Sequence, residues 1–146
     1  AGIFLVIFTL TVVVWCDAGA YFAGRAYGRH PLAPRISPSK TLEGALGGLL
    51  GGAAAGLIVK SIFDLFWSPL AGVLPWRLVI PFALVLSIVG IVGDLVESLL
   101  KRDAEVKDTG RLLPGMGGVL DRMDASLLAL PVMYYMLLAY FYFTVR

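Results

Sequence analysis

Residues 78–100 read LVIPFALVLSIVGIVGDLVESLL, and they are apolar over a length that can cross a lipid bilayer. A helix needs roughly 20 predominantly apolar residues, rising about 1.5 Å each, to span a hydrocarbon core of ~30 Å. Pro81 stands near the beginning of this run, where a helix tolerates proline best. We therefore predict a transmembrane helix over residues 78–100.

Three further apolar runs accompany it, over residues 3–15, 44–66 and 125–145. Hydrophobic residues make up 59% of the chain and charged residues only 15%, a composition that soluble globular domains do not show. The predicted fold class is all-α: a polytopic integral membrane helical bundle with about four transmembrane helices. Because the first run is short and the chain opens on Ala1, we expect the C-terminal part of a longer protein.

Two polar segments, residues 17–44 and 97–124, hold most of the basic residues. The positive-inside rule predicts that both face the cytoplasm, which four alternating crossings also require. Two polar segments in one compartment can build one site. The lone Cys16 excludes an internal disulfide and a cysteine zinc cluster, and the net charge of +2 is too small to indicate nucleic acid binding.

Glycines recur every fourth residue in GALGGLLGGAAAG, at Gly44, Gly48, Gly52 and Gly56. This spacing places small residues on one helix face, so that another helix can approach closely. A phosphate-cradling glycine loop is the alternative. We favour packing, because no strand is predicted before the run and no Lys-Ser/Thr pair ends it.

Asp94 is a carboxylate deep in an apolar run, where ionised side chains cost roughly 2.5–3.5 kcal/mol to insert. On a helix it shares one face with Glu97, Ser98 and Lys101. One interpretation is a helix end at which a solvated Asp94 pairs with Lys101. We favour the other, a functional polar stripe.

The segment after this helix, SLLKRDAEVKDTGRLLPGMGGVLDRMD at residues 98–124, alternates acidic and basic side chains around a glycine-rich turn. Carboxylates bind hard cations, whereas Lys and Arg bind phosphate oxygens. The glycines let the backbone approach a ligand without Cβ clashes. Asp121 and Asp124 suit the N-terminal turn of the fourth helix. For Asp124, capping of that helix and a role in ligand binding are equally plausible interpretations. Asp121 could instead meet Asp94 around one or two cations, because two facing carboxylates repel without one.

The first polar segment offers a second group of candidates. Residues 17–21 are expected to end the first helix. Ser37, Lys40 and Thr41 are residue types that contact phosphates, and Glu43 could cap the second helix or contact a base or a metal. His30 is expected to be a solvated loop residue rather than a metal ligand.

Together these strings resemble the phosphatidate cytidylyltransferase (CDP-diacylglycerol synthase) family of integral membrane enzymes. That family's signature is Ser-x-x-Lys-Arg, four residues, Lys-Asp, then Pro-Gly-His-Gly-Gly and Leu-Asp-Arg-x-Asp. Here it falls on Ser98, Lys101, Arg102, Lys107, Asp108, Pro114, Gly115, Gly117, Gly118, Asp121, Arg122 and Asp124. The strings 17–21 and 37–44 and the pair Gly93-Asp94 also resemble the family. The match spans essentially the whole chain and corresponds to the family's C-terminal, catalytic half.

Met116 stands where the family usually has histidine. We expect this replacement to have little effect on activity. In the reaction that the family catalyses, the attacking group would be the phosphate monoester of phosphatidate. Its second pKa is near 6, so it is already an anion at neutral pH and needs no base.

The resemblance implies that CTP and phosphatidate react to give CDP-diacylglycerol and pyrophosphate, by in-line attack on the α-phosphorus with Mg²⁺ as the cofactor. It implies that residues 1–146 form a single membrane-embedded catalytic domain, in the bacterial inner (cell) membrane, with the site facing the cytoplasm. The implied metal ligands are Asp94 and Asp121. The implied catalytic side chains with a positive charge are Lys101, Arg102, Lys107 and Arg122. Asp108 and Ser98 are implied as secondary ligands, with a second, monovalent cation such as K⁺ as their candidate partner. The implied substrate-binding set is Asp17, Tyr21, Ser37, Lys40, Thr41, Glu43, Ser98, Gly117, Gly118 and Asp124.

The bilayer is the implied environment, nucleic acid is not an expected partner, and a homodimer stays open. Three alternatives also stay open: a related CTP-dependent enzyme acting on another lipid phosphate or a polyprenol, an ion-coupled transporter that uses Asp94, and a catalytically silent scaffold. A transporter is disfavoured because its path needs polar groups at mid-depth, whereas the charges here gather on one side.

Overall fold

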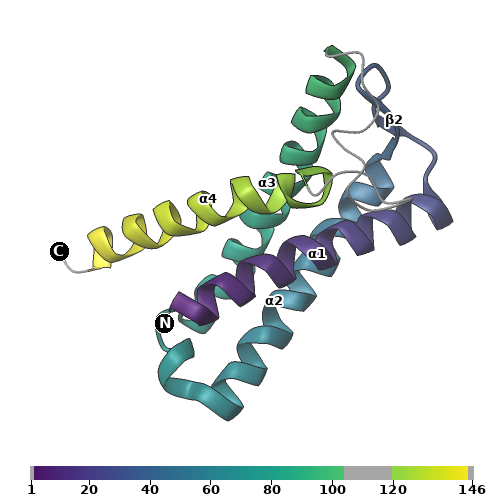
Figure 1. Ribbon diagram of the computed structural model, residues 1–146. Helices are drawn as coiled ribbons and strands as arrows, with labels where there is room; N and C mark the ends of the chain where they lie inside the picture. Colours follow the sequence, from purple (N-terminus) through teal and green to yellow (C-terminus); the bar gives the residue numbers. More distant parts are fainter. Residues whose placement is uncertain (1, 104–119, 145–146) are drawn as a thin grey trace.

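The computed structural model describes the backbone of residues 2–103 and 120–144, and the side chains of residues 2–67, 72–103 and 126–144. Within these ranges the chain forms four long helices and one short hairpin (Figure 1). The elements are α1 (Gly2–Tyr27), β1 (Pro31–Ala33), β2 (Ser37–Thr41), α2 (Leu42–Ala71), α3 (Trp76–Asp103) and α4 (Leu120–Thr144).

All four helices are long and apolar enough to cross a membrane, so the predicted polytopic helical bundle is confirmed. Their buried faces meet in one apolar core that includes Phe4 and Phe8 of α1, Phe63 of α2, Leu86 of α3 and Met133 of α4. Large apolar side chains also cover much of the outer surface, which suits a lipid environment.

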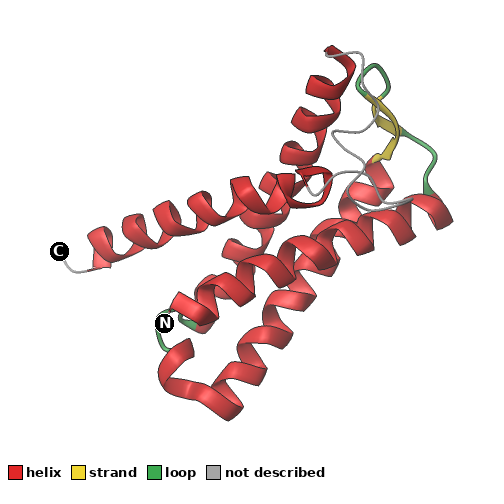
Figure 2. Ribbon diagram, viewed as in Figure 1, coloured by secondary structure: helices red, strands yellow, loops and turns green. Residues whose placement is uncertain are grey.

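The helices α1 and α2 lie side by side along most of their length, and the hairpin lies at the end where α1 finishes and α2 begins (Figure 2). The helix α3 contacts both of them, and α4 contacts α3 and α1 before running away from the hairpin. The backbone of α2 leaves helical geometry at Trp67 (φ −144°, ψ 50°), two residues before Pro69. A proline inside a helix removes a hydrogen bond and clashes with the preceding turn, which accounts for this kink.

The predicted glycine face is confirmed as a packing surface. A Cβ at Gly48 would lie 2.9 Å from the carbonyl oxygen of Cys16, and one at Gly44 would lie 2.9 Å from that of Ala20. At the far end of the row, a Cβ at Gly56 would lie 3.0 Å from Cβ of Ala83 in α3. The glycines thus let α2 approach two neighbouring helices, as small-residue motifs do in membranes.

The first helix is longer than predicted, and residues 17–21 lie inside it rather than at its end. The polar residues did not stop the helix, because Gly19 and Ala20 pack against the glycines of α2 while the side chains of Asp17 and Tyr21 stay exposed. The helix ends instead at Tyr27, where the amide of Gly28 donates to the carbonyl of Gly24 at 3.0 Å.

The hairpin was not predicted either. Its strands pair antiparallel, with Pro31 opposite Thr41 and Ala33 opposite Ser37, and an irregularity between these pairs. Strands of three and five residues that contain prolines give no clear alternating pattern, so the sequence could not reveal them. The predicted polar segment 17–44 is therefore a helix end followed by a hairpin.

Candidate functional site

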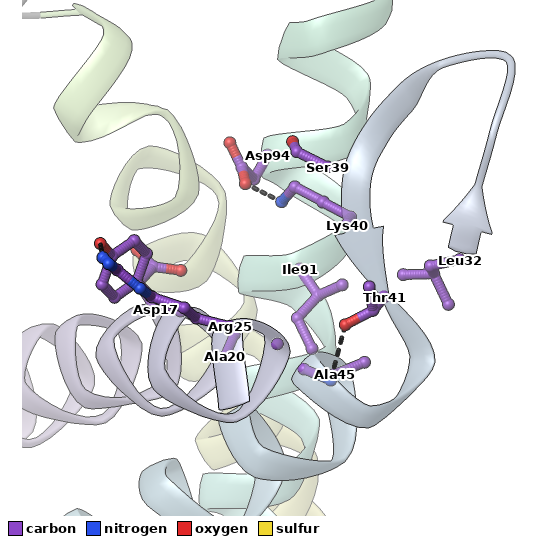
Figure 3. A pocket seen from close by; sticks show the side chains of 13 residues that line it. Asp17, Ala20, Arg25, Leu32, Ser39, Lys40, Thr41, Ala45, Ile91 and Asp94 are labelled. Carbon is purple, nitrogen blue, oxygen red and sulfur yellow. Dashed lines mark hydrogen bonds and ion pairs between the residues drawn. The ribbon is translucent and has the colours of Figure 1, made fainter. Parts of the chain in front are cut away.

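A cavity of about 490 Å³ lies where α1, the hairpin, the start of α2 and the middle of α3 come together (Figure 3). Its charged and polar lining comes from Asp17, Tyr21, Arg25, Ser39, Lys40, Thr41 and Asp94. Its apolar lining comes from Ala20, Leu32, Ala45 and Ile91, with Gly24 and Gly44 between them. One cavity therefore offers both charged groups and an apolar wall to a ligand.

The central contact of the cavity is an ion pair between Lys40 of β2 and Asp94 of α3, drawn as a dashed line in Figure 3. The Lys40 side chain is 25% exposed and the Asp94 side chain 39% exposed. Because both groups are partly exposed, a ligand can reach them. Their mutual attraction is still screened less than it would be in bulk water. Two residues far apart in the sequence, both predicted as site residues, are thus brought together.

The rest of the predicted stripe on α3 is occupied by contacts within the helix. Lys101 Nζ lies 2.6 Å from Glu97 Oε1, and the hydroxyl of Ser98 donates to the carbonyl of Asp94 at 2.9 Å. Arg102 is exposed at the end of α3. Asp94 is the member of the stripe that lines the cavity in the described part of the chain.

The wall formed by α1 carries Asp17, Tyr21 and Arg25 at helical spacing, so that all three share one face. Arg25 Nη1 donates to the Tyr21 hydroxyl at 3.0 Å. Arg25 was not among the predicted site residues, although its spacing of four residues from Tyr21 would have revealed it had the first helix been predicted to its true end. Ser39, next to Lys40, was missed as well.

The side chains of Thr41 and Glu43 both accept hydrogen bonds from backbone amides near the start of α2. The hydroxyl of Thr41 accepts the amide of Gly44 at 3.1 Å, an N-cap for α2, while its side chain still lines the cavity. Glu43 Oε2 accepts the amides of Arg29 at 3.2 Å and His30 at 3.3 Å. These contacts fasten the turn after α1 to the first turn of α2.

His30 lies on the surface with its side chain 75% exposed, in line with the expected solvated residue, and its Nδ1 lies 2.6 Å from Glu43 Oε1. Ser37, predicted to contact substrate, is buried, and its hydroxyl lies 3.4 Å from that of Ser39. Among the described residues, Ser37 and Glu43 are outside the lining of the cavity.

Several predicted residues lie outside what the structure describes. Lys107, Asp108, Gly117 and Gly118 fall between α3 and α4, as does Met116. The backbone of α4 begins at Leu120, so its first turns include Asp121, Arg122 and Asp124, and the two aspartates were predicted there. The side chains of these three residues are outside the described set. The meeting of Asp94 with Asp121 therefore stays a prediction.

In the described part of the chain, no cluster of three or more His, Cys, Asp or Glu side chains could hold a metal ion. Mg²⁺ is commonly held by one or two carboxylates together with substrate phosphates, so a single carboxylate on a cavity wall is compatible with it. Asp94 meets that requirement, and its contact with an ammonium group indicates that this position favours a cation.

The comparisons with known proteins agree with this architecture. Residues 1–140 match the model of the cytidylyltransferase family. The phosphatidate cytidylyltransferase of Bacillus subtilis is 44% identical over 133 residues, which cover 90% of this chain and 46% of that protein. The same-named protein of Brucella suis is 46% identical over 133 residues, covering 91% and 46%. That of Haemophilus influenzae is 40% identical over 145 residues, covering 99% and 47%.

The chain therefore spans about half the length of the curated relatives it matches. A solved structure of an intramembrane enzyme for archaeal membrane lipid biosynthesis superposes with a TM-score of 0.65 at 24% identity, covering 89% of this chain and 76% of that one. This likeness supports the fold. Because the family model matches residues 1–140, nearly the whole length, the chain belongs to the cytidylyltransferase family.

Proposed function

We propose that this chain is the catalytic half of a CTP:phosphatidate cytidylyltransferase, a membrane nucleotidyltransferase that makes CDP-diacylglycerol and pyrophosphate. The observation that carries the proposal is the cavity that holds Lys40 and Asp94 beside an apolar wall at one end of a membrane bundle. A lipid phosphate presents the same combination, an anionic head on an apolar body. The names of the relatives favour this reaction over others in the family.

The reaction joins a phosphate oxygen of phosphatidate to the α-phosphorus of CTP, while the bond from that phosphorus to the bridging oxygen breaks and pyrophosphate leaves. The attacking phosphate is already an anion at neutral pH, so no side chain has to remove a proton. The task of the protein is therefore to position two polyanions and to offset their repulsion.

The residues of the cavity fit that task. Asp94, with Asp121, would hold Mg²⁺, which supplies Lewis-acid stabilisation of the charge that gathers on the phosphates. Arg25 and Lys40 place two cationic groups on the cavity wall for phosphate oxygens. Ala20, Ala45 and Ile91 exclude water from the apolar side, which strengthens the electrostatic interactions inside.

We place the cavity on the cytoplasmic side, in the bacterial cell membrane. The hairpin end of the bundle carries Arg25, Arg29, Arg35 and Lys40, and such basic residues collect in cytoplasmic segments. The opposite end carries Trp67 and Trp76, which suit a membrane interface. CTP is a cytoplasmic nucleotide, so this orientation gives the cavity access to it.

The test measures pyrophosphate release from CTP by the full-length protein in lipid nanodiscs. Release that needs both phosphatidate and Mg²⁺, with CDP-diacylglycerol as the lipid product, supports the proposal. Release with a polyprenyl phosphate but not with phosphatidate would assign the chain to a related lipid substrate. Ion flux across proteoliposomes without CTP consumption would instead favour the transporter alternative.

A further inference from the structure

We propose that Lys40 is the resident counter-ion of Asp94 and that it changes partners when a divalent cation binds. In the state described here, the ammonium group of Lys40 occupies the position beside the Asp94 carboxylate. A divalent cation at Asp94 would displace it toward the phosphates of the nucleotide. This inference rests on the proposed function, because it takes Asp94 as a ligand of the catalytic cation.

The surroundings of the pair allow such an exchange. Both side chains line the same cavity, so a displaced Lys40 ammonium stays in contact with the space where phosphates would lie. Lysine carries its charge on a flexible four-carbon stem with three rotatable donors, so the head group can move while the backbone stays in place.

The backbone that carries Lys40 is fastened on both sides. Thr41, the next residue, caps α2 through the amide of Gly44. The start of the hairpin is held by Glu43, which accepts the amides of Arg29 and His30. These contacts keep the base of the Lys40 side chain near Asp94 whichever partner its ammonium has.

The exchange would couple the two ligands. A divalent cation that binds alone must break the ion pair and separate the Lys40 ammonium from the Asp94 carboxylate. When nucleotide phosphates are present, the displaced ammonium finds a new anionic partner, so each ligand improves the binding of the other. Lys40 would thus be a positioning residue that makes cation binding depend on nucleotide binding.

A purely structural ion pair is the competing explanation, in which Lys40 ties the hairpin to α3 and takes no part in ligand binding. The two explanations differ in what removal of Lys40 does to the affinity of Asp94 for a cation. Partner exchange predicts a higher affinity, because the competing ammonium is gone. A structural tie predicts lower thermal stability and no gain in affinity.

The experiment measures Mn²⁺ binding to the full-length protein by electron paramagnetic resonance, with and without CTP and in the absence of phosphatidate. Mn²⁺ is a suitable probe because carboxylate sites that take Mg²⁺ also take it. For Lys40→Met without CTP, we expect the Kd for Mn²⁺ to fall by roughly two- to fivefold, the modest change fitting a partly exposed ion pair. The decrease in Kd that CTP brings to the unmodified protein should be smaller in this variant.

Arg25→Met is the matched control, because it removes another positive charge from the same cavity that is not paired with Asp94 in the structure. If it lowers the Kd for Mn²⁺ as much as Lys40→Met does, the effect is one of general charge and the proposal is overturned. An unchanged or higher Kd in Lys40→Met also overturns it.

Asp94→Asn separates this inference from the proposed function. If Asp94→Asn abolishes Mn²⁺ binding while Lys40→Met leaves the Kd unchanged, Asp94 keeps its role as a cation ligand and only the partner exchange fails. If Asp94→Asn binds Mn²⁺ normally, both the assignment of the ligand and the exchange fail.

Discussion

Glu43 Oε1 lies 2.6 Å from His30 Nδ1, and the other oxygen of the same carboxylate accepts the amides of Arg29 and His30. One side chain in the first turn of α2 therefore fixes the chain that leaves α1. That chain leads directly into the hairpin, whose second strand carries Lys40 into the cavity. In the structure Glu43 contacts the backbone that leads into the hairpin, and it does not line the cavity.

We expect Glu43→Ala to reduce turnover of CTP and to lower thermal stability together, because the amides of Arg29 and His30 lose their acceptor and the hairpin shifts. Glu43→Gln should keep much of both, since an amide oxygen can still accept those two hydrogen bonds. Steady-state kinetics and thermal unfolding in detergent measure the two effects. His30→Ala is the control, and it should have the smaller effect because it removes one contact of three.

A different outcome would revise this role. If Glu43→Gln abolishes activity while the melting temperature stays unchanged, Glu43 contacts a substrate or a cation directly.

The glycines of α2 yield a prediction about packing. In Gly48→Ala the new Cβ would lie 2.9 Å from the carbonyl oxygen of Cys16, a backbone atom that cannot easily move. We expect a loss of stability of about 1–3 kcal/mol, the usual range for overpacking. The measurement is unfolding of the purified protein by heat or denaturant in detergent.

Gly90→Ala is the matched control in α3. There the nearest atom to a new Cβ is Cγ1 of Val13 at 3.7 Å, an ordinary contact distance. This variant should be neutral or stabilising by roughly 0.5–1 kcal/mol, because alanine favours the helix over glycine. Equal losses in both variants would contradict the assignment of the Gly44–Gly56 row as the surface that packs against α1.

The carboxylates yield a prediction about chemistry. Asp94→Asn and Asp121→Asn should each lower Mg²⁺-dependent CTP turnover by roughly a hundredfold or more while the protein stays folded. The amide keeps the size of the side chain and removes the negative charge that a hard cation requires. Turnover is measured by pyrophosphate release and folding by gel filtration and melting temperature. Wild-type activity in either variant would remove that residue from the metal site.

The four membrane helices could be predicted from the composition and length of the apolar runs. The contacts that build the candidate site could be predicted only in part. Apolar runs of bilayer length specify four helices because lipid leaves the backbone few other solutions. The end of α1 was misplaced at residues 17–21 because polar residues usually mark a helix boundary in a membrane, whereas here Asp17 and Tyr21 line a cavity. No local pattern reports that Lys40 pairs with Asp94, since that contact depends on how a hairpin folds back over α3.

Two predicted substrate-binding residues, Glu43 and Ser37, lie outside the cavity lining in the described structure, and one reason applies to both. Glu43 and Ser37 are residue types suited to ligands, and composition alone cannot tell whether such a side chain meets a ligand or the protein's own backbone. Here Glu43 meets the amides of Arg29 and His30, and Ser37 is buried against Ser39. Arg25 was missed for a different reason: the first helix was predicted to end before it, so its place four residues after Tyr21 on the cavity wall was not recognised.

Arg25 yields the last prediction. It lines the cavity from α1 and is held by the Tyr21 hydroxyl, so its guanidinium is positioned for an anionic ligand. We expect Arg25→Gln to raise the KM for CTP or phosphatidate by about tenfold, equivalent to ~1.4 kcal/mol of lost binding, with a smaller change in kcat. Arg29→Gln is the matched control, because Arg29 is an exposed arginine four residues further along that does not line the cavity in the described structure. Because both variants remove one positive charge from the same end of the bundle, an equal rise in KM would indicate long-range attraction of anions rather than a contact made by Arg25. A rise confined to one substrate would identify which of the two lies against α1.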